Sequence, residues 1–374
     1  MFNQRLPQNN KPSQPTGAHS PEAQTRLIKF DSELIPETLR PLANNYTASN
    51  VMRLQSSDEQ QLVKWISKRE PANEDFACHS EPYVIEGKEN LSHFLFYGGL
   101  AGTGFPWKEI ATDFNKEWGN QVEVYSLAGH DGTMETLADI SHEDWVEDVI
   151  NKAEKAQLRS GEPVVFFGFS TSAVAVLDAA SRRPELFAAL VLVAPPIRLR
   201  QNYLTTLLGL AERLDAWVPG VSKIAKKIKF PLASRKVSEG YGENFTKSPR
   251  MDWVPLSTLV SLSRLQKKAR AAVPSIESPV LVIQGTEDTY VKAKTSERLV
   301  ARLGSSEKDI VLFEGSPHPV MLSTCEEEFV KTVHSWLQRL GERGIVELDI
   351  GQKENPTRAK KGWKHFKAKF LSFK

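Results

Sequence analysis

The chain has 374 residues, of which 40% are hydrophobic, and a formal net charge of +2. This length and apolar content are sufficient for one large domain with extensions, and they disfavour two equal domains. The balanced charge gives no indication of a nucleic-acid partner.

The cysteines and the lack of long apolar runs indicate the compartment. Cys78 and Cys325 show neither the spacing of a metal site nor a disulfide pattern, so we expect a reducing compartment and no bound metal. The N-terminus has no apolar signal segment, and no run reaches the roughly 18 to 20 apolar residues of a membrane span. We therefore expect a cytoplasmic protein.

The N-terminal part differs in composition from the rest of the chain. Residues 1–25 contain prolines among Asn, Gln and Ser, so we expect this segment to be disordered. Residues 26–80 carry more apolar groups, and the run from Ser57 to Lys68 starts with a capping signal that predicts a helix. We expect residues 26–80 to form an extension that packs on the core, and the sequence assigns this extension no function.

A cluster of glycines follows the apolar run that begins at Phe94. Its spacing matches neither a G-x-G-x-x-G motif nor a phosphate-binding loop that ends in Gly-Lys-Ser/Thr. A flexible turn is therefore a better interpretation than a phosphate site. The glycines are Gly98, Gly99, Gly102 and Gly104.

The segment from Val164 to Ala173 has the pattern of a buried strand, a tight turn and a helix, with Ser170 in the turn. This is the layout of a nucleophile elbow, in which a serine occupies a strained turn between a strand and a helix. Ser172 stands where the usual G-x-S-x-G motif has its second glycine, and Ala173 keeps the next position small. Taken alone, Ser170 also fits an ordinary turn or capping residue.

An insertion follows the apolar strand Leu190–Ala194, and we expect residues 197–270 to form a helical cap. Such a cap often forms the walls of an apolar acyl pocket, although ordinary helix packing explains each residue singly. As a group, these residues favour a lipophilic acyl chain over a charged or peptidic substrate. The apolar positions, interspersed with lysines, are Leu204, Leu207, Leu208, Leu214, Trp217, Val218, Val221, Ile224 and Ile228.

Two further apolar strands each end in a loop with a residue suited to catalysis. Asp288 follows the strand Val280–Gly285, and His318 follows the strand Ile310–Phe313. A serine hydroxyl needs a base such as histidine, and a carboxylate can orient and stabilise the imidazole. Taken singly, Asp288 fits a turn residue, Glu287 fits the acid, and His318 fits a surface residue. The order Ser, Asp, His at three strand ends favours the catalytic interpretation.

The C-terminal extension, residues 341–374, ends in a basic amphipathic pattern. Lysines alternate with Trp363, Phe366, Phe370 and Phe373, which lie on one face of a helix. Such a helix over residues 357–374 would bind an anionic membrane and place the protein peripherally at the inner membrane face. The alternatives are that the aromatic stripe packs on the core or that the tail is solvated.

The stretch from about Ser92 to Leu340 resembles the α/β-hydrolase superfamily, and within it the carboxylesterase and monoacylglycerol lipase group related to serine aminopeptidases. The resemblance implies an α/β fold with a mostly parallel sheet flanked by helices, formed by residues 81–196 and 271–340. It also implies a serine-hydrolase mechanism without a metal or organic cofactor. The segments that carry it are Phe94–Thr103, Leu127–Gly132, His142–Asp148, the elbow GFSTSA, and QGTEDTYV before SPH.

The resemblance implies that the backbone N–H groups of Leu100 and Thr171 form an oxyanion hole. Donors aimed at the developing oxyanion usually give the largest single share of rate enhancement. The family has His-Gly where this chain has Gly98-Gly99. A backbone donor survives this change, but the support that the histidine gives to the loop is lost.

The expected reaction is hydrolysis of a carboxylic ester, such as a monoacylglycerol or a similar lipid ester, through an acyl-enzyme on Ser170. An acyltransferase or a thioesterase would use the same three residues. A catalytically inactive lipid-binding or scaffolding protein is suggested by Gly98 and Ser172, but the complete set of Ser170, Asp288 and His318 disfavours it. The sequence does not predict the oligomeric state.

Overall fold

The computed structural model describes residues 80–130, 134–199, 226, 229–231, 251, 253–349 and 369–372. Four predictions therefore lie wholly or mostly outside the described residues. They are the disorder of residues 1–25, the extension 26–80 with its helix from Ser57 to Lys68, and the helices expected between residues 200 and 228. The fourth is the part of the basic tail from residue 357 to residue 368.

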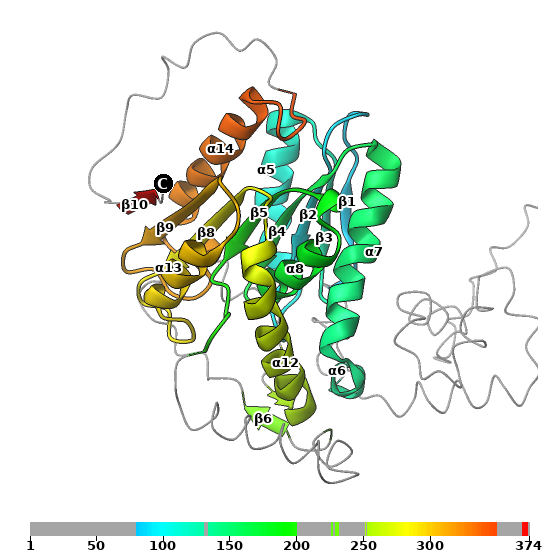
Figure 1. Cartoon of the computed structure of the whole chain (residues 1–374). Helices are drawn as coiled ribbons and strands as arrows, with labels where there is room; N and C mark the ends of the chain where they lie inside the picture. Colours follow the sequence, from blue (N-terminus) through cyan, green and yellow to red (C-terminus); the bar gives the residue numbers. More distant parts are fainter. Residues whose placement is uncertain are drawn as a thin grey trace, which may run out of the picture. The chain divides into compact units, whose positions relative to one another are not determined.

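Among the described residues, eight strands form one sheet in the order β1-β3-β2-β4-β5-β8-β9-β10 (Figure 1). The strands from β3 to β9 in this order are parallel, whereas the outer strands β1 and β10 are antiparallel to their neighbours. The carboxyl ends of β2, β4, β8 and β9 therefore meet at one edge of the sheet. The strands are β1 (Tyr83–Ile85), β2 (Phe94–Tyr97), β3 (Val122–Tyr125), β4 (Val164–Phe169), β5 (Phe187–Val193), β8 (Val280–Gly285), β9 (Lys308–Phe313) and β10 (Lys369–Ser372).

Helices cover both faces of this sheet (Figure 1). α5 and α14 pack on one face, and α7, α8 and α13 lie on the other. This arrangement confirms the predicted mostly parallel sheet with flanking helices. The helices are α5 (Lys108–Trp118), α6 (Met134–Asp139), α7 (His142–Ser160), α8 (Thr171–Arg182), α12 (Leu256–Ala272), α13 (Ala293–Arg302) and α14 (Glu326–Glu342), and the 3₁₀ turns are η3 (Phe105–Trp107), η4 (Pro184–Leu186), η5 (Val273–Ser275) and η6 (Val320–Leu322).

The core on the α5 and α14 face is rich in aromatic rings. Side chains alternate between the two faces of a strand, so Phe94 and Phe96 of β2 both point to this face. Phe96 stacks on Phe167 of β4 with ring centroids 4.0 Å apart, and Phe114 of α5 packs against both Phe94 and Phe96. These contacts hold β2 and β4 side by side, with fixed positions for the two loops that follow them.

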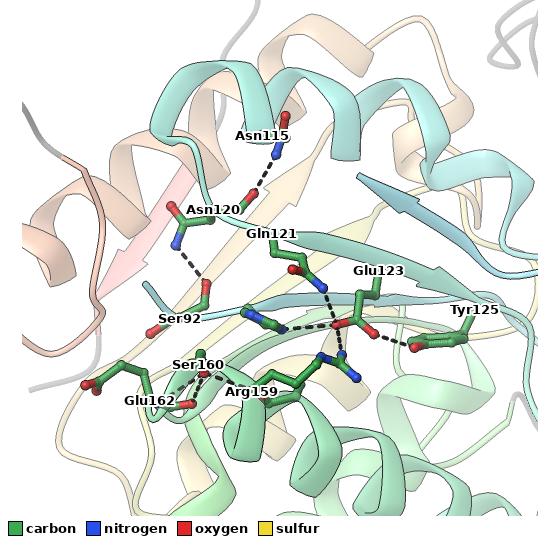
Figure 2. A network of polar contacts seen from close by, with 11 residues as sticks. Ser92, Asn115, Asn120, Gln121, Glu123, Tyr125, Arg159, Ser160 and Glu162 are labelled. Atoms are coloured by element: carbon green, nitrogen blue, oxygen red, sulfur yellow. Dashed lines mark hydrogen bonds and ion pairs between the residues drawn. The ribbon is translucent and has the colours of Figure 1, made fainter. Parts of the chain in front are cut away.

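A buried carboxylate interrupts the apolar packing on the opposite face, beneath α7 (Figure 2). Glu123 of β3 is 2% exposed and accepts hydrogen bonds from Gln121 and Tyr125. Arg159, near the end of α7, forms an ion pair with it, and Nδ1 of His93 lies 3.1 Å from the same carboxylate. Burial raises the pKa of Glu123, but the hydrogen bonds from His93, Tyr125 and Arg159 outweigh burial and lower the pKa to about 2.

We expect Glu123→Gln to lower the stability of the fold at neutral pH. We also expect the stability of this variant to change less than that of the wild type when the pH is lowered. The pKa of Glu123 falls from an ordinary value of 4.5 to about 2 on folding, so its contribution is complete above pH 4.5 and is lost as the pH falls toward 2. That shift corresponds to roughly 3 kcal/mol. Urea unfolding at pH 7 and pH 3 measures the effect. If the wild type and Glu123→Gln lose the same amount of stability between pH 7 and pH 3, Glu123 does not have the lowered pKa assigned to it.

The described part of the cap region is not entirely helical. α12 is a helix, but β6 (Lys229–Pro231) and β7 (Trp253–Pro255) form a two-stranded antiparallel sheet. The prediction of a helical cap over residues 197–270 is therefore wrong at β6 and β7. Pro231 disfavours helical backbone at the residue before it, and this favours an extended segment that pairs with β7.

The end of the basic tail also differs from its prediction. Lys369–Ser372 form β10 and pair with β9 in antiparallel register, so a continuous helix over residues 357–374 is wrong for these four residues. The pairing with β10 provides hydrogen-bond partners for backbone N–H and C=O groups at the edge of β9. This tertiary interaction overrides the local helical pattern. In the described part of the chain, no helix has the length and apolar character that crossing a bilayer requires.

Candidate active site

Ser170 lies in a strained turn between β4 and α8. Its backbone has φ 56° and ψ −117°, a positive-φ conformation that residues other than glycine rarely adopt. The turn also requires glycine two residues earlier, because a Cβ atom at Gly168 would lie 2.7 Å from the backbone nitrogen of Ala173. The strand, turn and helix predicted from the sequence are therefore present, and Ser170 stands at the start of the helix.

The structure brings Ser170, His318 and Asp288 into one chain of hydrogen bonds. Nε2 of His318 is 3.0 Å from Oγ of Ser170, and Nδ1 of His318 is 2.7 Å from Oδ2 of Asp288. A carboxylate only accepts hydrogen bonds, so Nδ1 carries the proton and Nε2 is free to accept the serine proton. Glu287, the alternative acid, is exposed, whereas Asp288 is 1% exposed.

The described contacts of Asp288 include four donors. Its Oδ1 accepts the backbone N–H groups of Tyr290 and Val291, at 2.7 and 2.9 Å, and its Oδ2 accepts the side-chain amide of Gln284 at 2.8 Å in addition to His318. Burial raises the pKa of Asp288, but the charge and hydrogen bond of His318, with the Val291 and Gln284 donors, outweigh burial and lower the pKa. The carboxylate therefore stays ionised beside the imidazole.

Gln284 is itself fixed from α13. The hydroxyl of Ser296 donates to Oε1 of Gln284 at 2.8 Å, and both side chains are fully buried. This bond orients the amide so that its NH₂ group points to Asp288. Sequence reasoning gave neither residue a role. Gln284 opens the quoted segment QGTEDTYV, but it was interpreted only as part of a strand, and Ser296 stands in no quoted segment.

Two aromatic rings flank the imidazole. The ring of Phe169, the residue before Ser170, lies 5.1 Å from that of His318 between centroids, and the ring of Tyr290 lies 5.0 Å from it. The His318 side chain is 11% exposed. These contacts restrict the orientation of the imidazole and exclude water from its faces.

The two segments predicted to supply the oxyanion hole adjoin Ser170. Thr171 follows it as the first residue of α8 and is 1% exposed. Residues 98–104, called here the oxyanion loop, pass beside the serine, since a Cβ atom at Gly99 would lie 3.0 Å from Cβ of Ser170. Leu100 comes next in this loop. The role of Leu100 and Thr171 as donors stays a prediction.

The loop leaves no room for the histidine that the family has at its start. A Cβ atom at Gly98 would lie 2.3 Å from the carbonyl oxygen of Thr103. A different histidine contacts the loop instead, because Nε2 of His130 accepts the N–H of Ala101 at 3.0 Å. His130 belongs to the quoted segment Leu127–Gly132, and this position was the only signal for it in the sequence.

Ser172 fills the position of the second elbow glycine and ties the elbow to β2. Its hydroxyl accepts the N–H of Phe169 at 2.9 Å and lies 3.1 Å from the carbonyl oxygen of Tyr97 and 3.0 Å from that of Phe169. The side chain is fully buried. The hydroxyl thus connects the strand before the serine to the strand before the oxyanion loop.

Substitutions at Ser172 test how tightly this position is enclosed. Ser172→Gly should fold and retain function, whereas Ser172→Leu should lower stability by roughly 1–3 kcal/mol, because it inserts three additional carbon atoms between β2 and the elbow. Thermal unfolding of the two variants and the wild type gives the comparison. A leucine variant that melts at the wild-type temperature would show that the elbow is not closely packed.

The comparisons with known proteins agree with this fold. A monoacylglycerol lipase from Paleococcus ferrophilus superimposes with a TM-score of 0.57 at 20% identity, over 69% of this chain and 97% of that structure. The described sheet, its flanking helices and the elbow thus define an α/β-hydrolase. The chain belongs to the family described as serine aminopeptidase, S33, whose model matches residues 96–324. Both the predicted fold and the predicted group are confirmed.

Individual relatives are distant. Monoglyceride lipase from Mus musculus is 25% identical over 199 residues, which are 52% of this chain and 64% of that protein. A carboxylesterase from Bacillus subtilis is 22% identical over 261 residues, which are 70% of this chain and 97% of that protein. The matched region thus spans less than two thirds of the mouse lipase.

Within the described residues, no group of three or more His, Cys, Asp or Glu side chains is arranged to bind a metal ion.

Proposed function

We propose that this protein hydrolyses carboxylic esters with a lipid-like acyl chain, such as monoacylglycerols, through an acyl-enzyme on Ser170. The observation that carries the proposal is the continuous chain of hydrogen bonds from Asp288 through His318 to Oγ of Ser170. Such a chain supplies a nucleophile, a base and the group that orients the base. The names of the relatives, monoglyceride lipase and carboxylesterase, support the same reaction class.

The reaction has two halves. In the first, Nε2 of His318 takes the proton of Ser170 as Oγ attacks the ester carbonyl carbon, and the N–H groups of Leu100 and Thr171 bind the resulting oxyanion. His318 then returns the proton to the leaving alcohol as the ester C–O bond breaks. In the second half, His318 takes a proton from water as the water oxygen attacks the carbonyl carbon of the acyl-enzyme. His318 then returns this proton to Oγ of Ser170 as the bond between Oγ and the acyl carbon breaks, and the carboxylic acid leaves.

An apolar cluster beside the oxyanion loop supports a lipid-like acyl group. Ala101 of the loop packs with buried side chains of α6, β7 and α12, and Leu100 packs against the same cluster. The environment next to the proposed oxyanion donor is therefore apolar, and it suits a hydrocarbon chain better than a charged group. The buried members are Ala101, Leu137, Met251, Val254, Leu259 and Val260.

We expect Ser170→Ala to abolish covalent labelling by a fluorophosphonate probe and to lower the turnover of p-nitrophenyl esters by about 10³-fold or more, with the fold retained. His318→Ala should behave similarly, and Asp288→Asn should leave more residual activity. The matched control is Ser181→Ala, a serine at the far end of α8 that is remote from the elbow in sequence.

The same assay separates the proposal from its alternatives. A panel of p-nitrophenyl esters of increasing acyl length should give a higher kcat/KM for medium or long chains than for acetate. Esterase activity that persists in Ser170→Ala would exclude Ser170 as the nucleophile. A wild-type protein that neither labels nor hydrolyses any ester would favour the inactive lipid-binding alternative. Transfer of the acyl group to an added alcohol in preference to water would favour an acyltransferase.

A second prediction concerns the support of Asp288. Gln284→Leu should lower kcat about 10-fold or more, because Asp288 loses a donor and Ser296 loses its acceptor in a fully buried position. Ser296→Ala should have a smaller effect, since Gln284 still reaches Asp288. Steady-state kinetics with one good ester measures both. An unchanged kcat in Gln284→Leu would show that the backbone donors alone fix the acid.

A further inference from the structure

The oxyanion loop is fixed at Ala101 from both sides of the residue. Its N–H donates to Nε2 of His130 at 3.0 Å, and its carbonyl oxygen accepts the N–H of Met251 at 2.8 Å. Ala101 has φ 56°, a left-handed conformation that a residue with a Cβ atom adopts only when its surroundings enforce it. The peptide group between Leu100 and Ala101 is therefore held by His130.

The hydrogen bonds of His130 define its tautomer. Nδ1 lies 3.1 Å from the carbonyl oxygens of both Leu127 and Ala128. Carbonyl oxygens only accept, so Nδ1 carries the proton and Nε2 is a bare acceptor aimed at Ala101. The residue is 2% exposed, and burial lowers its pKa to about 4 although the two carbonyl groups oppose this shift. His130 is thus neutral at ordinary pH and keeps its acceptor.

The segment that carries His130 is itself held in place by α7. Nε1 of Trp145 donates to the carbonyl oxygen of Ala128 at 3.1 Å, and Trp145 is fully buried. The contact therefore runs from a helix that covers the sheet, through the backbone at Ala128, to the imidazole and then to the loop. An imidazole held in this way is a rigid support for the backbone that it contacts.

We propose that His130 is the positioning residue of the oxyanion hole and replaces, from the segment after β3, the support that a histidine at position 98 gives in related proteins. The inference rests on the proposed function, because it assigns the Leu100 N–H to the oxyanion. Gly98 cannot carry a side chain, since the carbonyl oxygen of Thr103 occupies that space. By fixing the N–H of Ala101, His130 fixes the orientation of the peptide group that follows Leu100, and with it the backbone of the donor residue.

The matched test compares His130→Gln with His130→Asn. The amide of glutamine reaches the position of Nε2 and can accept from Ala101, whereas the amide of asparagine is too short. We expect His130→Asn to lower kcat by about 10- to 100-fold with KM changed less than about threefold, because an oxyanion donor acts mainly in the transition state. His130→Gln should recover a large part of this loss.

The control is His93→Leu. His93 is also buried, at 4% exposure, and it contacts Glu123. It comes directly before β2, whereas the oxyanion loop follows the other end of this strand. We expect this variant to lose thermal stability and to keep kcat. All kinetics are measured below the unfolding temperature of the least stable variant, so that a loss of folded protein does not imitate a loss of turnover.

A second measurement reports on the oxyanion directly. A trifluoromethyl ketone with a medium alkyl chain forms a tetrahedral adduct with the serine, so its affinity should fall in proportion to kcat across the His130 variants. If the wild type is active and the His130→Asn variant keeps its kcat and ketone affinity within about twofold of the wild-type values, the inference is overturned. A variant in which KM changes while kcat does not would overturn it as well. A wild type that neither hydrolyses esters nor reacts with a fluorophosphonate would overturn the proposed function, and the inference with it.

Discussion

The close approach of β4 to the first turn of α8 is the constraint on which the site depends. Because Gly168 has no side chain, the backbone of Ala173 can come near it, and Ser170 is forced into a positive-φ conformation at the end of the strand. A hydroxyl in this position projects toward the loops that follow β8 and β9, where Asp288 and His318 stand. The aromatic packing between β2 and β4 then places the oxyanion loop beside the serine. Every other part of the site is positioned relative to this turn.

The chain departs from the usual pattern at two places near the serine, and at each place a hydroxyl or an imidazole binds the backbone. Ser172, in place of a glycine, bonds to the N–H of Phe169 and approaches the carbonyl oxygen of Tyr97. His130 bonds to the N–H of Ala101, in a loop whose first glycine excludes a side chain. Both residues contact backbone groups near Ser170, in the elbow and in the oxyanion loop. The departures therefore change which side chains contact the backbone near Ser170, and Ser170, His318 and Asp288 are still joined by hydrogen bonds.

The sequence predicted the elements whose signal is local. Buried parallel strands have near-continuous apolar runs, so Val164–Phe169 and Val280–Gly285 were identified as strands, and the positions of Asp288 and His318 in the following loops are confirmed. Contacts that join distant segments had no such signal. The bond between Ala101 and His130 and the relay from Ser296 to Asp288 depend on tertiary packing, as does the pairing of β10 with β9. The same limit explains the error at Lys369–Ser372, where a helical pattern was overridden by a sheet edge. The catalytic roles of Ser170, Asp288 and His318 stay predictions.

Two buried carboxylates in this fold differ in the cations that lie against them. Glu123 and Asp288 are both almost fully buried, both interact with a histidine through Nδ1, and both have a lowered pKa because hydrogen bonds outweigh burial. Glu123 also pairs with Arg159, a permanent cation, so its charge is balanced in every state of the protein. Asp288 lies against His318, an imidazole that carries a charge only when it is protonated. The proposed reaction forms an imidazolium on His318, and Asp288 lies where its charge would stabilise that cation, because it accepts the Nδ1 proton of the same ring.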